Sequence, residues 1–147
     1  MKRIIVVLAT LLVSLSLFGQ NGKNVSVGVD ACMDAFLSTE YSIAPSFGIG
    51  VRTRVGRPDQ WFNLVGGLRY IYGRRLSGFQ IPIMLNVNLL KGKQTSAYLG
   101  GGYEFDFIGT YWGCTKFQIG LAWRHLDFRI FYKNYQGDLG AGVTYYF

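Results

Sequence analysis

Apolar and polar residues alternate with a period of two along most of the chain from Asn24 onward, and this pattern constrains the fold more than any other feature. Successive side chains of a β-strand point to opposite faces, so the alternation predicts strands whose two faces meet different surroundings. It divides into eight segments: residues 25–33, 43–54, 61–72, 79–90, 96–107, 115–124, 127–133 and 139–147. Segments of about ten residues have the length that a tilted strand needs to cross a bilayer. We therefore expect an all-β fold, an eight-stranded antiparallel up-and-down transmembrane β-barrel.

The distribution of glycine predicts which face of each strand is inside. The interior of an eight-stranded barrel is only just filled by side chains. The apolar face is rich in Phe, Tyr, Trp, Leu and Ile, whereas the polar face holds nine glycines against Gly66 and Gly101 on the apolar face. These nine are Gly28, Gly48, Gly50, Gly67, Gly100, Gly102, Gly120, Gly140 and Gly142. Small residues suit the crowded side, so we expect a polar lumen and a lipid-facing apolar surface rather than a soluble, lipocalin-like barrel of opposite polarity.

The first residues have the layout of a secretory signal peptide. Lys2 and Arg3 precede the apolar run from Ile4 to Val13, and small or weakly polar residues follow up to Gln20. Because the run is short for a membrane-spanning helix, a signal peptide over residues 1–20 is favoured over a retained anchor helix. Its removal leaves residues 21–147, one barrel domain, and lowers the formal net charge from +7 to +5. The remaining basic residues are scattered, which argues against a nucleic-acid partner.

Opposite charges predict the register of three hairpins. A two-residue turn at His125-Leu126 pairs Arg124 with Asp127, a loop over residues 134–137 pairs Lys133 with Asp138, and a third hairpin pairs Asp106 with Lys116. Cross-strand pairs of opposite charge stabilise a sheet. Pro82 removes a hydrogen-bond donor from its strand, so we expect a β-bulge near it.

The polar face predicts an ion-pair network that fills the lumen. Glu104 and Asp106 share one face, as a carboxylate pair for acid–base chemistry would, but basic residues share the same interior and buried charges need partners. The predicted network contains Arg52, Arg54, Arg69, Glu104, Asp106, Lys116, Arg124, Asp127, Arg129, Lys133 and Asp138.

The remaining candidate residues do not indicate a catalytic, metal or cofactor site. His125 is the only histidine and lies in a predicted turn without a nearby serine, so a catalytic triad is not expected. Cys32 and Cys114 both carry lumen-facing parity, and the sequence leaves a disulfide between them open. There is no metal-ligand spacing or phosphate-binding glycine loop, so no catalytic residue, metal or cofactor is predicted.

Two stretches carry a resemblance to known proteins. The closing residues 139–147, with Val143, Tyr145 and the terminal Phe147 on one face, resemble the terminal assembly signal of bacterial outer-membrane proteins. That resemblance implies recognition by the barrel assembly machinery. Residues 78–87 (GFQIPIMLNV) followed by 98–103 (YLGGGY) resemble the PorT-like outer-membrane β-barrel domain, a porin-family scaffold of Gram-negative bacteria. This implies a cell outer membrane location.

The sequence as a whole favours a non-enzymatic outer-membrane barrel with a charged, largely filled lumen and a structural role or an interaction role through its extracellular loops. Its partners would be outer-membrane lipid and, during biogenesis, the assembly machinery; no protein partner is indicated. A narrow porin-like channel for small solutes is the alternative. An outer-membrane lipid-modifying enzyme is a third possibility, with no catalytic constellation to support it.

Overall fold

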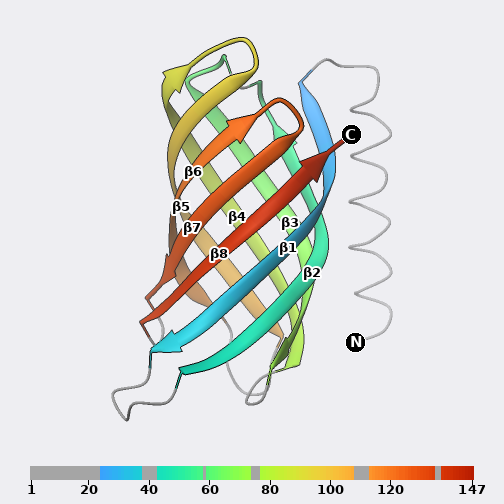
Figure 1. The fold of residues 1–147 in the computed structure, drawn as a ribbon, viewed down its shortest axis with the longest axis vertical. Coiled ribbons are helices and arrows are strands. Elements are labelled where there is room, and N and C mark those ends of the chain that lie inside the picture. The colour runs from blue at the N-terminus through green and yellow to red at the C-terminus, as the bar shows by residue number, and fades with distance from the viewer. Residues whose placement is uncertain (1–23, 38–42, 58, 74–76, 108–112, 135–136) are drawn as a thin grey trace.

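The chain forms a closed antiparallel barrel of eight strands in the computed structural model, which describes residues 24–37, 43–57, 59–73, 77–107, 113–134 and 137–147 (Figure 1). The strands are β1 (Val25–Leu37), β2 (Ile43–Val55), β3 (Phe62–Gly73), β4 (Ser77–Lys91), β5 (Thr95–Phe107), β6 (Cys114–Trp123), β7 (Leu126–Lys133) and β8 (Asp138–Tyr146). Each strand pairs with the next one along the chain, and β8 pairs with β1 to close the ring. The predicted fold class is confirmed. The predicted signal peptide lies outside the described residues.

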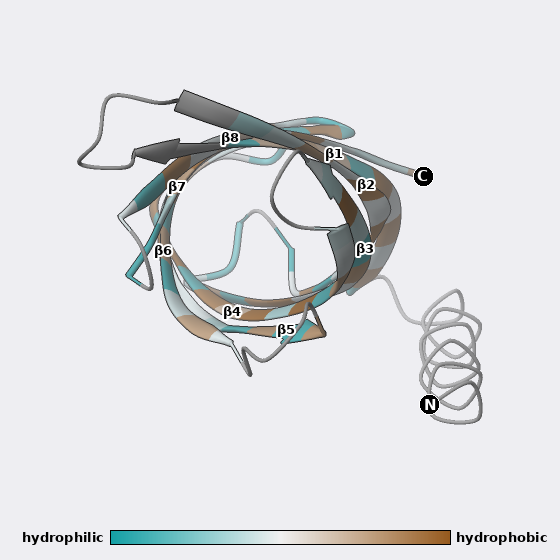
Figure 2. Cartoon of the chain, turned by 90° about the horizontal axis from the view of Figure 1, so that it is seen from below, coloured by the Kyte–Doolittle hydropathy of each residue, from teal (hydrophilic) through white to brown (hydrophobic). Residues whose placement is uncertain are grey.

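The two ends of the barrel differ in what they connect. Strands β2 and β3, β4 and β5, and β6 and β7 are joined at the end where the C-terminus lies, which we call the turn end (Figure 1). The opposite end, where β1, β3, β5 and β7 finish, is called the loop end here. Viewed along the barrel axis, the strands make one ring in which apolar and polar residues alternate along the wall (Figure 2). Among the described residues, no helix is long and apolar enough to span a bilayer.

The register of the hairpins agrees with one of the three predicted charge pairs. Lys133 lies opposite Asp138, as predicted. Asp127 lies opposite Ala122 instead of Arg124, because the β6–β7 turn is at Arg124 and His125, one residue earlier than predicted. Arg124 has a φ of 52°, the left-handed conformation that tight hairpin turns require.

The β5–β6 hairpin also differs from the prediction. Lys116 lies opposite Gly102, and Glu104 lies opposite Cys114, so Asp106 and Lys116 are not a cross-strand pair. The register of this pair is therefore displaced by four residues from the predicted one, and the paired part of the hairpin ends at Glu104 and Cys114.

Pro82 is accommodated without the predicted bulge. Strands β3 and β4 keep a single register from Tyr72↔Ser77 to Phe62↔Val87, and Pro82 lies opposite Glu104 in a regular β4–β5 pairing. The register shift in the β4–β5 pair lies between Asn88 and Leu90. The β3–β4 ladder lacks the two pairs at this point, Gly67 with Pro82 and Leu68 with Ile81, so the proline interrupts the pairing locally without changing the alignment of the strands.

Burial confirms the predicted faces. On β7, for example, Asp127, Arg129, Phe131 and Lys133 are buried, whereas Phe128, Ile130 and Tyr132 are exposed. The alternation follows the pleat of each strand, so the buried set points into the lumen and the exposed set points out.

Candidate functional site: the charged lumen

Inward-facing glycines make room for large lumen side chains. A Cβ atom added to Gly140 would lie 2.4 Å from the ring of Phe131, and one added to Gly120 would lie 2.3 Å from the ring of Tyr98. The two aromatic rings therefore lie directly against the glycines of the neighbouring strands. This arrangement lets an eight-stranded barrel bury bulky groups in a narrow interior.

Glu104 is the centre of a cluster in the half of the lumen nearer the loop end. One of its carboxylate oxygens pairs with the guanidinium of Arg69 and, at 2.8 Å, with the ammonium of Lys116. The other oxygen lies 2.8 Å from the ammonium of Lys133, which also pairs with Asp34. The cluster thus joins β1, β3, β5, β6 and β7 across the lumen.

The Phe131 ring packs against the basic members of this cluster. The ammonium of Lys116 lies 3.8 Å from the ring centroid, and the charged groups of Arg69 and Lys133 lie 5.5 and 5.6 Å from it. A cation near an aromatic face is attracted by the ring quadrupole, most strongly where water is excluded. Phe131 is 1% exposed. It therefore adds a favourable contact for three cations that share one buried carboxylate.

A second cluster lies farther from the loop end and is centred on Asp30. Its carboxylate accepts from Arg129 at 2.5 Å and from the hydroxyl of Thr144 at 2.6 Å. Arg129 also donates to the Thr144 hydroxyl at 2.8 Å. Charge-assisted hydrogen bonds of this kind are stronger than neutral ones. They fasten β1, β7 and β8 together where the barrel closes.

The half nearer the turn end contains a third group of contacts. Tyr98 donates to Asp127 at 2.6 Å, and the guanidinium of Arg54 lies 4.4 Å from the centroid of the Tyr146 ring. Arg52 donates to Gln118 at 3.3 Å, and Gln118 in turn donates to Asn86 at 2.7 Å. Polar contacts therefore continue along the whole described lumen.

The charges of the described lumen balance. The basic side chains are Arg52, Arg54, Arg69, Lys116, Arg129 and Lys133. The acidic side chains are Asp30, Asp34, Glu104, Asp106, Asp127 and Asp138. Six cations face six anions, so their mutual attraction offsets part of the cost of removing these charges from water.

The structure brings together most of the predicted network. Glu104, Arg69, Lys116 and Lys133 form the first cluster, and the lumen positions of Arg52, Arg54, Arg129, Asp106, Asp127 and Asp138 are also as predicted. Arg124 is the exception, because the turn places its side chain in the exposed rim, where it donates to Gln94. It therefore has no part in the lumen network.

The sequence prediction omitted two members, Asp30 and Asp34. Both are buried and paired with cations. The predicted first segment, residues 25–33, contains Asp30 but ends before Asp34. Their parity matches that of Gly28 and Cys32, so parity alone places Asp30 in the lumen, and a longer first strand would have added Asp34.

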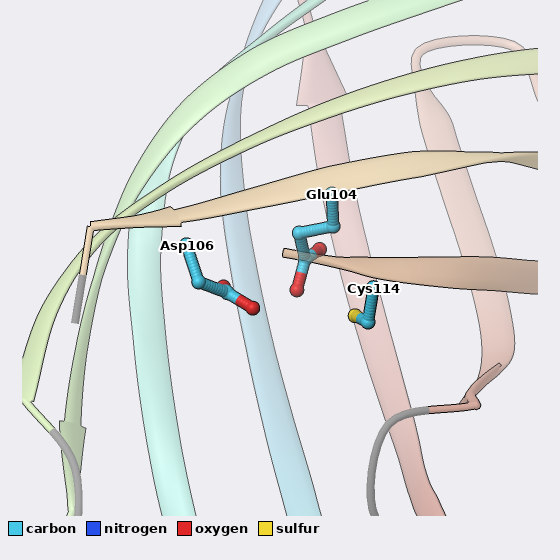
Figure 3. A group of neighbouring side chains, drawn as sticks. All are labelled: Glu104, Asp106 and Cys114. Carbon is cyan, nitrogen blue, oxygen red and sulfur yellow. The ribbon is translucent and has the colours of Figure 1, made fainter. Parts of the chain in front are cut away.

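One group of side chains has the composition of a metal site. Single ligand atoms of Glu104, Asp106 and Cys114 all lie within 4.8 Å of one another, near the loop end of the lumen (Figure 3). However, Glu104 is already paired with Arg69, Lys116 and Lys133. A metal ion would have to compete with these cations for it, so the donor set fits an ion-pair cluster better than a metal site.

Cys32 and Cys114 are both buried and both free thiols. Their predicted lumen-facing parity is confirmed, but they are not joined by a disulfide. Cys32 accepts a hydrogen bond from Arg69 at 3.2 Å, and Cys114 lies opposite Glu104. Each thiol therefore packs beside the Glu104 cluster.

His125 occupies the β6–β7 turn. One of its ring nitrogens lies 2.9 Å from the carbonyl oxygen of Tyr146, and its ring stacks on Tyr145 at 5.8 Å. These contacts hold the C-terminal strand against the turn. A catalytic triad requires hydrogen bonds from the histidine to a serine and to a carboxylate. Within the described residues, His125 makes neither of them.

The outer surface has the layering of a membrane protein. Its middle band is aliphatic and exposed: Ile49 is 65% and Ile119 is 55% exposed, and Ile83 and Ile130 lie in the same band. Most exposed aromatic side chains lie nearer one end or the other, but Tyr70 and Tyr103 lie opposite Ile49 and Ile83, and Phe117 and Phe128 are also exposed. Those nearer the loop end are Phe47, Tyr72, Phe79, Phe105, Phe107 and Tyr132, and those nearer the turn end are Trp61, Phe62, Trp123, Tyr145 and Phe147. An apolar band between two aromatic girdles is typical of barrels that span a bilayer.

The closed ring, the balanced polar interior and the banded exterior define a transmembrane-type β-barrel. The comparison with solved structures agrees: the chain is similar to a de novo designed transmembrane β-barrel, with a TM-score of 0.53 and 12% sequence identity over 83% of this chain and 95% of that one. No protein-family model matches the chain, and no curated protein matches it. The fold is therefore established by structure alone, and the PorT-like resemblance remains a prediction.

Proposed function

We propose that the chain is a small, non-enzymatic outer-membrane protein of a Gram-negative bacterium, with a closed lumen and a structural or interaction role through its extracellular loops. The observation that carries the proposal is the buried network around Glu104. Side chains from five strands meet there, and Glu104, Lys116 and Phe131 are at most 1% exposed. A lumen occupied in this way is a packed core rather than a pathway for solutes.

The outer-membrane location is supported by three features acting together. These are the predicted signal peptide over residues 1–20, the banded exterior of the barrel, and the resemblance of residues 139–147 to the assembly signal of outer-membrane proteins. In this reading the barrel assembly machinery recognises Val143, Tyr145 and Phe147. The PorT-like resemblance agrees with this location but favours no one activity, since barrel scaffolds host many functions.

One observation favours the narrow channel as a second candidate. Several buried lumen atoms, among them Asp34 Oδ1, Arg52 Nε, Arg54 Nε and Tyr146 Oη, have no hydrogen-bond partner among the described residues. Buried polar groups of this kind are commonly satisfied by internal water. A chain of such waters would give a path for protons or small ions.

Planar-bilayer conductance tests the closed lumen. We expect the wild-type barrel to give no reproducible openings. Replacing Lys116 and Lys133 together by alanine removes two side chains that cross the lumen, so this variant is expected to conduct. The matched control replaces Phe117 and Tyr132, the outward-facing neighbours on the same strands, and should stay silent.

Reproducible openings of the wild-type barrel that change when the lumen charges are changed would overturn the closed-lumen proposal in favour of the channel. Heat-modifiable mobility on gels should be recorded for each variant, so that a loss of folding is not read as a change in conductance. Lipid analysis with and without the protein tests the enzyme alternative, for which an unchanged lipid profile is expected.

A further inference from the structure

The exposed charges of the described residues all lie at the turn end. They are Arg57, Asp59, Lys91, Lys93 and Arg124. Arg57 and Asp59 pair with each other at 3.2 Å. The other three form no ion pair among the described residues, so the described side chains of the turn end include three positive charges without an ionic partner.

Two tryptophans accompany these charges. The ammonium of Lys91 lies 3.1 Å from the ring centroid of Trp61, and the guanidinium of Arg124 lies 5.8 Å from that of Trp123. Trp61 is 60% and Trp123 is 51% exposed, so both rings are open to the surroundings. Tryptophan prefers the boundary between hydrocarbon and headgroups. The basic side chains are therefore held at the level where lipid headgroups begin.

Hydrogen bonds fasten the turns that carry these residues. The backbone N–H of Arg124 donates to the carbonyl of Gln94 at 2.6 Å, and its side chain donates to the Gln94 amide oxygen at 3.2 Å. Asn88 of β4 donates to the carbonyls of Gln60 and Trp61 at 2.6 and 2.9 Å. The β4–β5 hairpin is thus bonded to the β2–β3 turn on one side and to the β6–β7 turn on the other. Groups held in this way lose less conformational entropy when they bind a ligand.

We propose that this basic rim, made of Lys91, Lys93 and Arg124 with Trp61 and Trp123, binds the headgroups of anionic phospholipids in the leaflet at the turn end. Charge complementarity selects an anionic group. The rim adjoins the exposed aliphatic band. A phospholipid fits both surfaces, because its phosphate can bind the basic side chains while its acyl chains contact the aliphatic band. Each basic side chain near an anionic surface strengthens binding by about fivefold.

This proposal rests on the membrane location of the barrel and not on its closed lumen. Trp61 and Trp123 make it testable by fluorescence in the full barrel, once Trp112, the third tryptophan of the sequence, is replaced by Phe. The barrel is folded into phosphatidylcholine vesicles that contain phosphatidylglycerol, with bromine atoms on the acyl chains of one lipid at a time. Bromine quenches a tryptophan only at close range, so the quenching reports which lipid occupies the rim.

We expect brominated phosphatidylglycerol to compete for the rim about fivefold or more better than phosphatidylcholine. The preference should weaken as salt is raised, since exposed charges are screened. The variant K91Q/K93Q/R124Q should lose the preference. The matched control R57Q removes one charge from the same end, but a charge already paired with Asp59, and should keep it.

Each other outcome overturns a distinct part of the proposal. Equal quenching by the two lipids in the unmodified rim overturns anionic-lipid binding and leaves an acidic protein as the occupant to test. A phosphatidylglycerol preference that survives K91Q/K93Q/R124Q overturns the assignment to these residues. If neither lipid quenches the tryptophans, the membrane location itself is wrong.

Discussion

Gly101 and Gly102 are consecutive residues of β5, and substitution of each by alanine tests which face of the wall is crowded. A Cβ atom on Gly102 would lie 2.0 Å from the carbonyl oxygen of Ile83 and 2.7 Å from the Cα of Met84. A Cβ atom on Gly101 would meet only the ring of Phe117, at 3.8 Å. The same added methyl group therefore meets backbone on the lumen side and free space on the lipid side.

The expected magnitudes follow from these distances. Real Cβ atoms essentially never approach other atoms within 3.0 Å, so in Gly102→Ala the backbone of β4 or β5 has to shift. Overpacking of this kind costs about 1–3 kcal/mol, and a clash with backbone belongs at the upper end of that range. Gly101→Ala introduces no clash and restricts the unfolded chain, which stabilises by about 0.4–1 kcal/mol where the backbone tolerates alanine. We expect the two variants to differ by about 3 kcal/mol in the free energy of unfolding.

Urea titration of the barrel folded in vesicles measures this difference, with the folded fraction followed by heat-modifiable mobility on gels. Both variants add one methyl group to adjacent residues of one strand, so effects on the unfolded chain largely cancel. Equal losses in the two variants, or a larger loss for Gly101→Ala, would refute the assignment of the lumen face.

Further predictions concern the lumen side chains. E104Q leaves Arg69, Lys116 and Lys133 without their shared carboxylate, so it should lower the free energy of unfolding by about 3–5 kcal/mol, and K116Q in the same chain should recover part of the loss. D59N breaks the exposed Arg57–Asp59 pair and should lower the free energy of unfolding by less than about 1 kcal/mol. Similar losses for E104Q and D59N would contradict the role of Glu104. Tyr98→Phe removes a hydrogen bond to a buried carboxylate and should cost about 1.5–3 kcal/mol, whereas Tyr132→Phe on the outer face should change stability by less than about 0.5 kcal/mol. A bulky maleimide should label neither Cys32 nor Cys114 in the folded barrel and both after unfolding; failure to label the unfolded, unreduced chain would indicate a disulfide after all.

The sequence by itself determined the architecture and the two faces of the wall. The alternation is a local property, because each side chain of a strand points away from its neighbours whatever the rest of the chain does. Nine glycines on one face then identified the crowded side without any structural information. The lumen positions of Glu104, Lys116 and Lys133 followed from parity alone and are confirmed.

Only the tertiary structure decided the register of each strand pair, that is, which residues of neighbouring strands lie opposite one another. Alternation defines a register only to within an even number of residues, since a shift of two keeps every side chain on its face. The predicted β6–β7 pairing was displaced by two residues and the β5–β6 pairing by four, so the faces were right while the pairs Arg124–Asp127 and Asp106–Lys116 were wrong. Contacts across the lumen depend further on the diameter and stagger of the closed ring. Asp30 and Arg129 are 99 residues apart in the chain, so their contact could not be predicted from a local sequence pattern.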